Sequence, residues 1–389
     1  MRKRWLGWTI LVVAGVVALA VAFPATVYVP LGLLRHEAFF AGKPTSYWTR
    51  ALKGERFLGH APPAGDIGKT LRDGGPAAVP VLCEIATSPD ESLRSEALIS
   101  LRLIGPEARA ATPVLAATIQ KETDSSRFQT ASEALAKVDL VAATETLSAV
   151  VRDKGDTGRR AWALTELEKL APHCEGALPV LNELLKSPDE GAVLRVQAIR
   201  VLWHLKQPAE PLVAALCAEA NDRKSPAGVQ ALEALGDMGP AAKPAVPTLL
   251  ELLQNPQLAS TGRRWGPAHR AAVIRTLGQI GPEAEAAVPA LLTLVNIDDF
   301  FLRREVALAL ARMGPSARQA LTTRDAVWGA SIALLVARPP VTIATLPLVQ
   351  IAKRTWIPRD PQTVFADPKA VGEAVRRIDP DALARAGIP

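Results

Sequence analysis

The chain has 389 residues, of which 49% are hydrophobic and 22% charged, and its formal net charge is +6. Two tyrosines, many alanines and leucines and no evident alternating β-branched strands disfavour a β sandwich or propeller and favour packed helices. Residues 1–34 hold three basic residues and no acid, which leaves 42 basic against 39 acidic residues for the rest. That near-neutral remainder makes a nucleic-acid partner a poor expectation, because such domains carry a strongly basic surface.

The N-terminus predicts a membrane anchor. Arg2, Lys3 and Arg4 precede an uncharged run over residues 5–23, which as a helix spans about 28 Å, close to the hydrocarbon thickness of a bilayer. The three basic residues favour an N-terminus inside the cell, so the chain after residue 34 is expected on the periplasmic or extracytoplasmic side of the cytoplasmic membrane. Pro24, Pro30 and Gly32 predict that the helix ends near Phe23 and leaves residues 25–34 as an apolar segment at the interface.

A cleaved signal peptide is the competing interpretation of the same segment. Residues 18–20 and 20–22 both fit a small-x-small cleavage pattern, and cleavage would release a secreted product. The apolar run is longer than the usual apolar part of a signal peptide, and Pro24 follows the later candidate site. Both features favour an uncleaved anchor.

Pairs of prolines seven residues apart recur along the rest of the chain. The first proline follows glycine or alanine, and the second opens an apolar run; the clear pairs are Pro106 and Pro113, Pro172 and Pro179, Pro240 and Pro247, and Pro282 and Pro289. Related turns are separated mostly by 30 to 42 residues or about twice that, which indicates a solenoid of helical hairpins. If each first helix begins at the first proline, the second proline lies inside that helix and bends it.

An aspartate and an arginine mark the second helix of several units. The arginine follows the second proline by fourteen residues at Arg94, Arg127 and Arg303, and an aspartate precedes it in the turn at Asp90, Asp124 and Asp299. Aspartate is a preferred helix N-cap, and a guanidinium can reach the turn of a neighbouring unit. We therefore expect a structural ladder of capped turns and arginines.

These residues resemble HEAT repeats: a proline inside the first helix, an aspartate in the turn and an arginine early in the second helix. The resemblance covers about residues 71–389. The lead-in FFAGKPTSYWTRALKG and the ending AVRRIDPDALARAG resemble segments of membrane-anchored HEAT proteins of planctomycete-type bacteria. The resemblance implies an all-α fold, a right-handed α-solenoid of about nine hairpins, and no common reaction. We assign residues 1–34 to the anchor or signal segment, 35–75 to the lead-in and N-terminal capping helices, and 76–389 to the solenoid, and we expect Trp48 to pack against the first full repeat.

Motifs for chemistry are weak. GDIGKT resembles a phosphate loop, but Pro63 stands where that loop needs glycine. The five histidines and three cysteines show no metal-ligand spacing, and Cys83 and Cys217 lie in apolar helical runs typical of buried cysteines. We therefore predict no catalytic residue, metal, cofactor or small-molecule substrate.

One segment stands out as a candidate partner contact. The unit between Pro240 and Pro282 is about nine residues longer than usual, and its extra residues lie in LASTGRRWGPAHR, within an acid-free stretch. Arginine with exposed tryptophan is typical of interaction hot spots, and the candidate residues are Arg263, Arg264, Trp265, His269, Arg270 and Arg275. A protein-binding scaffold is the leading hypothesis, a binder of anionic polysaccharide or nucleic acid the second, and a HEAT-like lyase or hydrolase the third. The alternative for Trp265 is that it only folds the loop onto its own repeat.

Overall fold

The protein was analysed as a computed structural model. It describes residues 25–55, 65–187, 190–222, 225–255, 267–294 and 299–314, together with Ala317. The predicted anchor over residues 5–23, the residues Arg263, Arg264 and Trp265, and the C-terminal repeats lie outside these residues. The chain divides into two compact units, Met1–Asp189 and Glu190–Pro389, and each is described by itself.

The first unit opens with a lead-in of helices α2 (Ala25–Leu34) and α3 (Thr45–Leu52), joined by the antiparallel strands β1 (Phe39–Phe40) and β2 (Lys43–Pro44). Trp48 is 3% exposed, and its indole nitrogen donates to the carbonyl oxygens of Phe40 and Lys43, both at 3.2 Å. Its ring packs against Phe40 and Tyr47. Trp48 is therefore a core residue of the lead-in itself, while α3 packs on the first full hairpin through α5.

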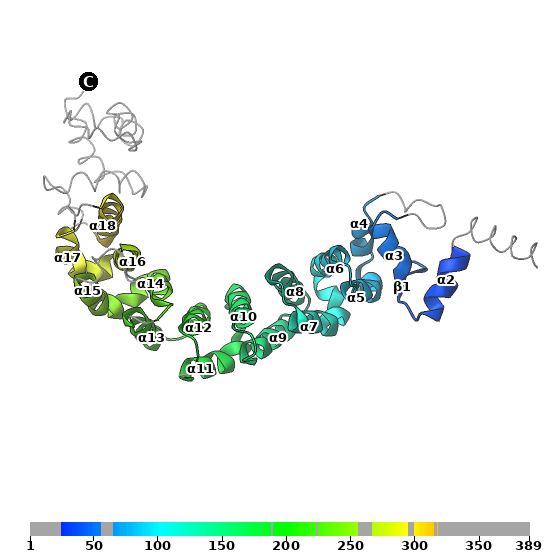
Figure 1. Cartoon of the computed structure of the whole chain (residues 1–389), viewed down its shortest axis with the longest axis horizontal. Coiled ribbons are helices and arrows are strands. Elements are labelled where there is room, and N and C mark those ends of the chain that lie inside the picture. Colours follow the sequence, from blue (N-terminus) through cyan, green and yellow to red (C-terminus); the bar gives the residue numbers. More distant parts are fainter. Residues whose placement is uncertain are drawn as a thin grey trace, which may run out of the picture. The chain divides into compact units, whose positions relative to one another are not determined.

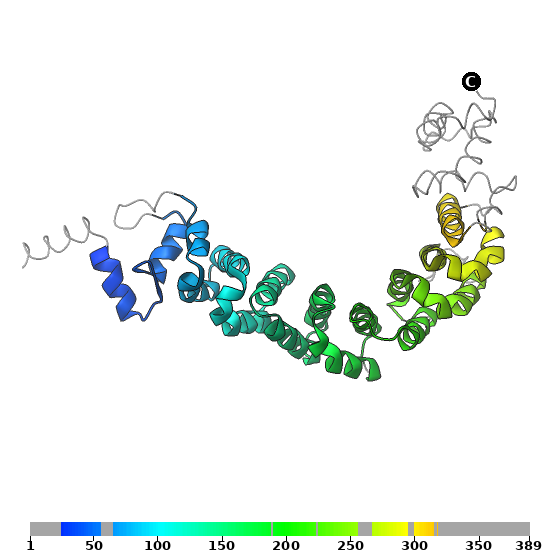
Figure 2. The same ribbon diagram turned by 180° about the vertical axis from the view of Figure 1, so that it is seen from behind.

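The remaining helices of the first unit form two layers, which both views show side by side (Figure 1 and Figure 2). One layer contains the second helix of each hairpin: α4 (Ile67–Asp73), α6 (Glu91–Ile104), α8 (Ser125–Val138) and α10 (Thr157–Leu170). The other contains α5 (Val79–Ala86), α7 (Thr112–Lys121), α9 (Leu140–Arg152) and α11 (Leu178–Lys186). Leucines and Phe128 fill the space between the layers with no exposed surface, which is the main source of stability in such stacks.

The second unit repeats this arrangement. Its second helices are α12 (Ala192–His204), α14 (Gly228–Asp237), α16 (Pro267–Ile280) and α18 (Phe300–Met313). The helices of the other layer are α13 (Ala209–Asn221), α15 (Val246–Gln254) and α17 (Val288–Leu292). Contacts join α12 to α14, α14 to α16 and α16 to α18. Within each unit, the second helix of one hairpin therefore packs on the second helix of the next hairpin.

The proline pairs mark the hairpins, but the role of the second proline differs from the expectation. A short 3-10 helix begins at the Gly-Pro in η1 (Gly75–Ala78), η2 (Gly105–Ala111), η4 (Gly239–Ala245) and η6 (Gly281–Ala287), and η3 (Glu175–Ala177) follows Ala171-Pro172 by two residues. The α-helix starts only afterwards, with Pro80, Pro113, Pro179, Pro247 or Pro289 in its first turn. First-turn N–H groups have no intrahelical partner, so these prolines remove no hydrogen bond.

The bend at the start of each hairpin, where a 3-10 helix leads into the α-helix, has another origin. Ala108 and Ala284 have ψ of 20° and 18°, outside the helical range, so the chain kinks within the 3-10 segment. Glycine before the first proline has positive φ, for example 70° at Gly105 and 75° at Gly281. Only glycine adopts this conformation without strain. The predicted helix stop at Gly-Pro is thus confirmed, and the predicted proline kink is replaced by a 3-10 to α junction.

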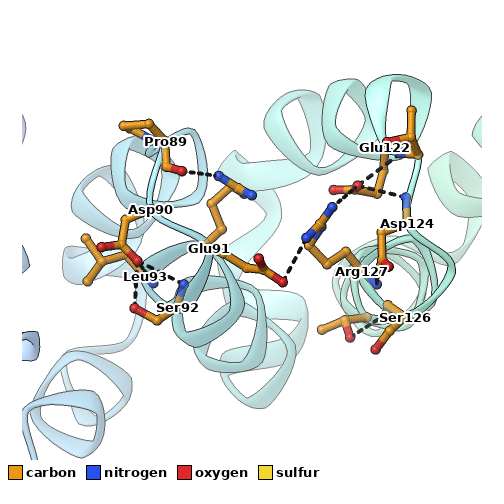
Figure 3. A network of polar contacts seen from close by, with 12 residues as sticks. Pro89, Asp90, Glu91, Ser92, Leu93, Glu122, Asp124, Ser126 and Arg127 are labelled. Carbon is orange, nitrogen blue, oxygen red and sulfur yellow. Dashed lines mark hydrogen bonds and ion pairs between the residues drawn. The ribbon is translucent and has the colours of Figure 1, made fainter.

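The aspartate caps are confirmed. Asp90 accepts from the backbone nitrogens of Ser92 and Leu93, and Asp124 accepts from that of Arg127 at the start of α8 (Figure 3). Asp299 accepts from the nitrogen of Leu302 at the start of α18. Asp139 is a helix cap that the spacing of the proline pairs did not indicate. It alone separates α8 from α9 and accepts from the nitrogen of Ala142 at 3.1 Å, which explains how a unit begins there without Gly-Pro.

The arginines divide into two groups. Arg94 donates to the carbonyls of Ser88 and Pro89 in its own turn, both at 2.8 Å. Arg127 contacts Glu122 of its own turn at 3.0 Å and Glu91 of the preceding hairpin at 2.8 Å (Figure 3). Of the two predicted arginines whose side chains the structure describes, Arg127 reaches a neighbouring unit as expected and Arg94 contacts only its own turn in the bonds given above; the side chain of Arg303 lies outside the described part of the structure.

Residues 25–34 are helical, which differs from the expectation of an apolar segment after the end of the helix. They form α2 with Pro30 inside it, and α2 packs against β2 and α3. Among the helices of the described ranges, none combines the length and the apolar character that a membrane crossing requires.

Candidate functional site

The predicted contact segment is described only in part. His269, Arg270 and Arg275 lie on α16. His269 is 2% exposed and lies against Gly228, and burial lowers its pKa to about 4. Nε of Arg275 lies 3.3 Å from Oε2 of the buried Glu305 on α18. His269 and Arg275 therefore make contacts inside the unit, and the contact role of the whole segment stays a prediction.

A groove in the first unit has the features of a binding surface. It has a cavity volume of about 390 Å³ and crosses the second helices α6, α8 and α10. We call it the α6–α10 groove. Its lining residues are Arg102, Leu103, Ser132, Glu133, Ala136, Lys137, Glu166, Lys169 and Leu170.

The apolar part of this groove includes an exposed leucine. Leu103 is 61% exposed, whereas Leu98 and Leu101 of the same helix are buried under the other layer. Successive helical residues are rotated by about 100°, so the side chain at position 103 points about 200° away from that of Leu101 and off the buried face of α6. Ala136 and Leu170 continue the apolar surface onto α8 and α10. Single exposed leucines are common, but a leucine beside further apolar groups in a hollow suits a partner's side chain.

Charged side chains border the apolar part in ordered positions. Nη1 of Arg102 and Oε2 of Glu133 are 2.5 Å apart and join α6 to α8. Glu133 also accepts from the side-chain amide of Gln129, and this hydrogen bond and the arginine hold the pKa of Glu133 below its usual value. Lys169 pairs with Glu166 at 2.7 Å on α10. The pairs hold these side chains in position, so less conformational freedom is lost when a partner binds.

The same groove is poorly equipped for catalysis. Burial raises the pKa of Glu166, but Lys169 already occupies one of its oxygens. Ser132 donates to the carbonyl of Phe128 at 2.8 Å, and no histidine lies beside it among the lining residues. Nowhere in the described ranges do three or more His, Cys, Asp or Glu residues gather as a metal site would require. The arrangement offers apolar contact and charge-assisted hydrogen bonds, which are means of recognition.

A second hollow lies in the second unit. Its cavity volume is about 570 Å³, and it lies where α14, α16 and α18 end. Pro240, Gly281 and Pro282 of the Gly-Pro turns line part of it together with the helical glycines Gly236 and Gly278, and its polar side chains are Asp237, Gln279 and Arg312. Its open, backbone-rich lining gives fewer side-chain contacts than the α6–α10 groove.

No sequence motif marks the α6–α10 groove. One signal was present in the sequence: Leu103 falls outside the apolar face that Leu93, Ala97, Leu98 and Leu101 define. The other lining residues come from three hairpins, and their convergence depends on the stacking of the units.

Comparison with known proteins supports the fold. Residues 79–168 and 263–328 match a family model described as HEAT repeats, and residues 228–255 match one described as a PBS lyase HEAT-like repeat. No curated protein sequence matches the chain.

Several solved structures resemble the chain at low identity. A crystal structure of importin beta in an ammonium sulfate condition is 12% identical with a TM-score of 0.47, covering 95% of this chain and 57% of importin beta. A structure of Kap95p, whose binding induces the switch loops of RanGDP to adopt the GTP-bound conformation, is 14% identical with a TM-score of 0.42, covering 82% and 48%. An engineered protein is 21% identical with a TM-score of 0.19, covering 79% and 96%.

This chain thus spans about half the length of the two importin-type structures. Because all three TM-scores are below 0.5, we infer nothing about function from these likenesses. The family matches and the two layers of helical hairpins together support a HEAT-repeat protein with an all-α solenoid fold.

Proposed function

We propose that this chain is a non-enzymatic protein-interaction scaffold that binds a partner protein in the α6–α10 groove. The single observation that supports this most is the exposed Leu103 beside the ordered Arg102–Glu133 pair. An apolar anchor point bordered by charged groups is the usual composition of a protein interface. HEAT solenoids expose long surfaces of this kind, because each unit contacts only its neighbours.

The scaffold is tethered to a membrane by residues 5–23 in this proposal. The uncharged run and the three preceding basic residues support it, and together they favour repeats on the extracytoplasmic side of the cytoplasmic membrane. Cleavage after residue 20 or 22 would instead give a secreted scaffold. Membrane fractionation of the full chain, with mass analysis of its N-terminus, distinguishes the two.

A matched pair of positions tests the groove. Leu103 and Val141 are both exposed apolar residues of the first unit, at 61% and 67%, but Val141 lies on α9 in the other layer. A photoreactive amino acid at position 103 should crosslink a defined partner in cells, and the same group at position 141 should not. Leu103→Asp should abolish the crosslink from a second groove position, Lys137, while Val141→Asp should leave it unchanged. Equal crosslinking from positions 103 and 141 would reject the groove as the binding site.

The basic segment is proposed as an additional contact. Replacing Arg263, Arg264 and Trp265 by alanine should weaken capture of that partner without lowering the melting temperature. Salt separates the two kinds of ligand, since binding of an anionic polymer weakens steeply as salt rises. Unchanged capture by the triple variant would remove the segment from the interface and leave the groove proposal standing.

A further inference from the structure

Helix α2 has one face packed on the protein and one apolar face exposed. Its ten residues, ATVYVPLGLL, contain no charge. Tyr28 and Gly32, four residues apart, are buried. Leu31, Leu33 and Leu34 are 42%, 62% and 78% exposed, and the neighbouring Pro30 is exposed as well. Half of the exposed large apolar side chains in the described residues lie on this one helix, so the exposure is concentrated.

Close contacts hold α2 against the lead-in. The rings of Tyr28 and Tyr47 lie 5.0 Å apart. A Cβ atom at Gly32 would stand 2.4 Å from Cβ of Pro44, closer than such atoms approach, so glycine is what lets α2 lie directly on β2. The exposed leucines therefore lie on the side of α2 that faces away from β2 and α3.

The end of α2 is equally well defined. His36 has a φ of 53°, and its nitrogen donates to the carbonyl of Leu33 at 3.2 Å while that of Glu37 donates to the carbonyl of Gly32 at 2.9 Å. These two hydrogen bonds form a Schellman motif, which stops the helix and reverses the chain. Arg35, 64% exposed at its side chain, follows the leucines directly.

The lead-in is fastened in turn to the first full hairpin. The nitrogen of Ala38 donates to Oε1 of Glu84 on α5 at 2.7 Å, and Nζ of Lys53 lies 2.6 Å from Oδ2 of Asp90 at the start of α6. α2 is thus part of the same packed body as the first repeats, not a free linker.

We propose that the exposed face of α2 lies on the surface of a lipid bilayer. This rests on the proposed membrane tether, because α2 begins directly after the charge-free run over residues 5–23 and is therefore held within reach of the lipid. Leucines of an interfacial helix enter the boundary between headgroups and acyl chains. Residues 35–55 carry four lysines and arginines against two glutamates, a balance that suits anionic headgroups.

An environment-sensitive fluorophore on the full chain tests this position. The chain is reconstituted in vesicles of phosphatidylcholine and phosphatidylglycerol, with the label on Leu34→Cys and, as the control, on Val141→Cys, which is similarly exposed on α9. Labelling at neutral pH favours the new cysteine, because burial raises the pKa of Cys83 and of Cys174 to about 11 and raises that of Cys217 as well.

The label at position 34 should shift its emission to the blue and be quenched by nitroxide-bearing lipids, while the label at position 141 should show neither effect. A water-like label at position 34 on membrane-bound protein overturns the inference and leaves the tether intact. A blue shift without quenching by lipid nitroxides also overturns it, since a second copy of the chain would then cover the leucines. Failure of the chain to associate with the vesicles overturns the tether and the inference together.

Discussion

Two glycines of the second unit should respond differently to the same substitution. A Cβ atom at Gly278 on α16 would stand 2.6 Å from Cα and 2.9 Å from Cβ of Ala309 on α18. A Cβ atom at Gly236 on α14 would stand 2.1 Å from Oε1 of Gln279. The first obstacle is backbone and a methyl group of a packed helix; the second is the tip of a flexible side chain that can rotate away.

The expected magnitudes follow from this difference. Alanine gains about 0.8–1 kcal/mol over glycine inside a helix. At Gly278 this gain opposes an overpacking cost of about 1–3 kcal/mol, because α16 and α18 must move apart. The backbone of α18 cannot rotate away, so the overpacking cost should lie in the upper part of that range, and Gly278→Ala should destabilise the α16–α18 contact by about 1–2 kcal/mol. Gly236→Ala should change stability by no more than about 0.5 kcal/mol, since the propensity gain offsets the restricted motion of Gln279.

Hydrogen exchange followed by mass spectrometry measures both effects locally. Local readout is needed because long repeat arrays do not unfold in a single two-state step. Gly278→Ala should speed exchange in peptides from α16 and α18 by about 5- to 30-fold, and Gly236→Ala should leave exchange in α14 and α16 nearly unchanged. Equal acceleration by the two substitutions, or none at Gly278, would show that neighbouring helices re-space freely and would refute the packing explanation.

Two further predictions concern the turn proline and the buried histidine. Pro113→Ala should change the stability of α7 by less than about 1 kcal/mol in hydrogen exchange, because Pro113 lies in the first helical turn. A change of about 3 kcal/mol would instead indicate that Pro113 lies in the helix interior. Burial lowers the folded-state pKa of His269 to about 4, so the unfolded chain binds the extra proton between pH 6.5 and 4 and stability falls as pH falls through that window. Hydrogen exchange of α16 at pH 7 and 4.5, corrected for the intrinsic pH dependence of exchange, should show that His269→Gln loses part of this pH dependence and that His173→Gln, at an exposed position, does not.

The proline pairs show what the sequence can and cannot determine about this fold. Their spacing correctly marks the hairpins, because a Gly-Pro stop is a local signal that needs no tertiary contact. A proline inside a bent helix and a proline opening an α-helix after a 3-10 turn produce the same letters. The structure favours the second arrangement at Pro113 and Pro289, since a first-turn proline loses no hydrogen bond.

The α6–α10 groove could not be predicted from the sequence, for a different reason. Arg102, Glu133 and Lys169 lie in three different hairpins, and their approach depends on how far each hairpin is rotated against the previous one. A pattern of apolar positions reports which face of a helix is buried, but not which polar residue of the next helix it meets. Leu103 alone was visible as a leucine off the apolar face.

The arginines that follow the capping aspartates also have contacts that the proline spacing alone does not predict. Arg94 and Arg160 stand four positions after the capping aspartates Asp90 and Asp156, and each donates to carbonyls at the end of its own hairpin's first helix or in the turn after it. Arg127 stands three positions after its cap and contacts Glu91 of the preceding hairpin.

Arg159, also three positions after its cap, donates to the carbonyls of Ile119 and Gln120 of the preceding hairpin, at 3.1 and 2.6 Å. One position corresponds to a rotation of about 100° around the helix, which is enough to bring a guanidinium within reach of the neighbouring hairpin, even where, as at Arg127, it also contacts its own turn. Counting from the second proline placed Arg94 and Arg127 in one class. Counting from the aspartate separates them, because the cap sets where the helix begins and hence which way each later side chain points.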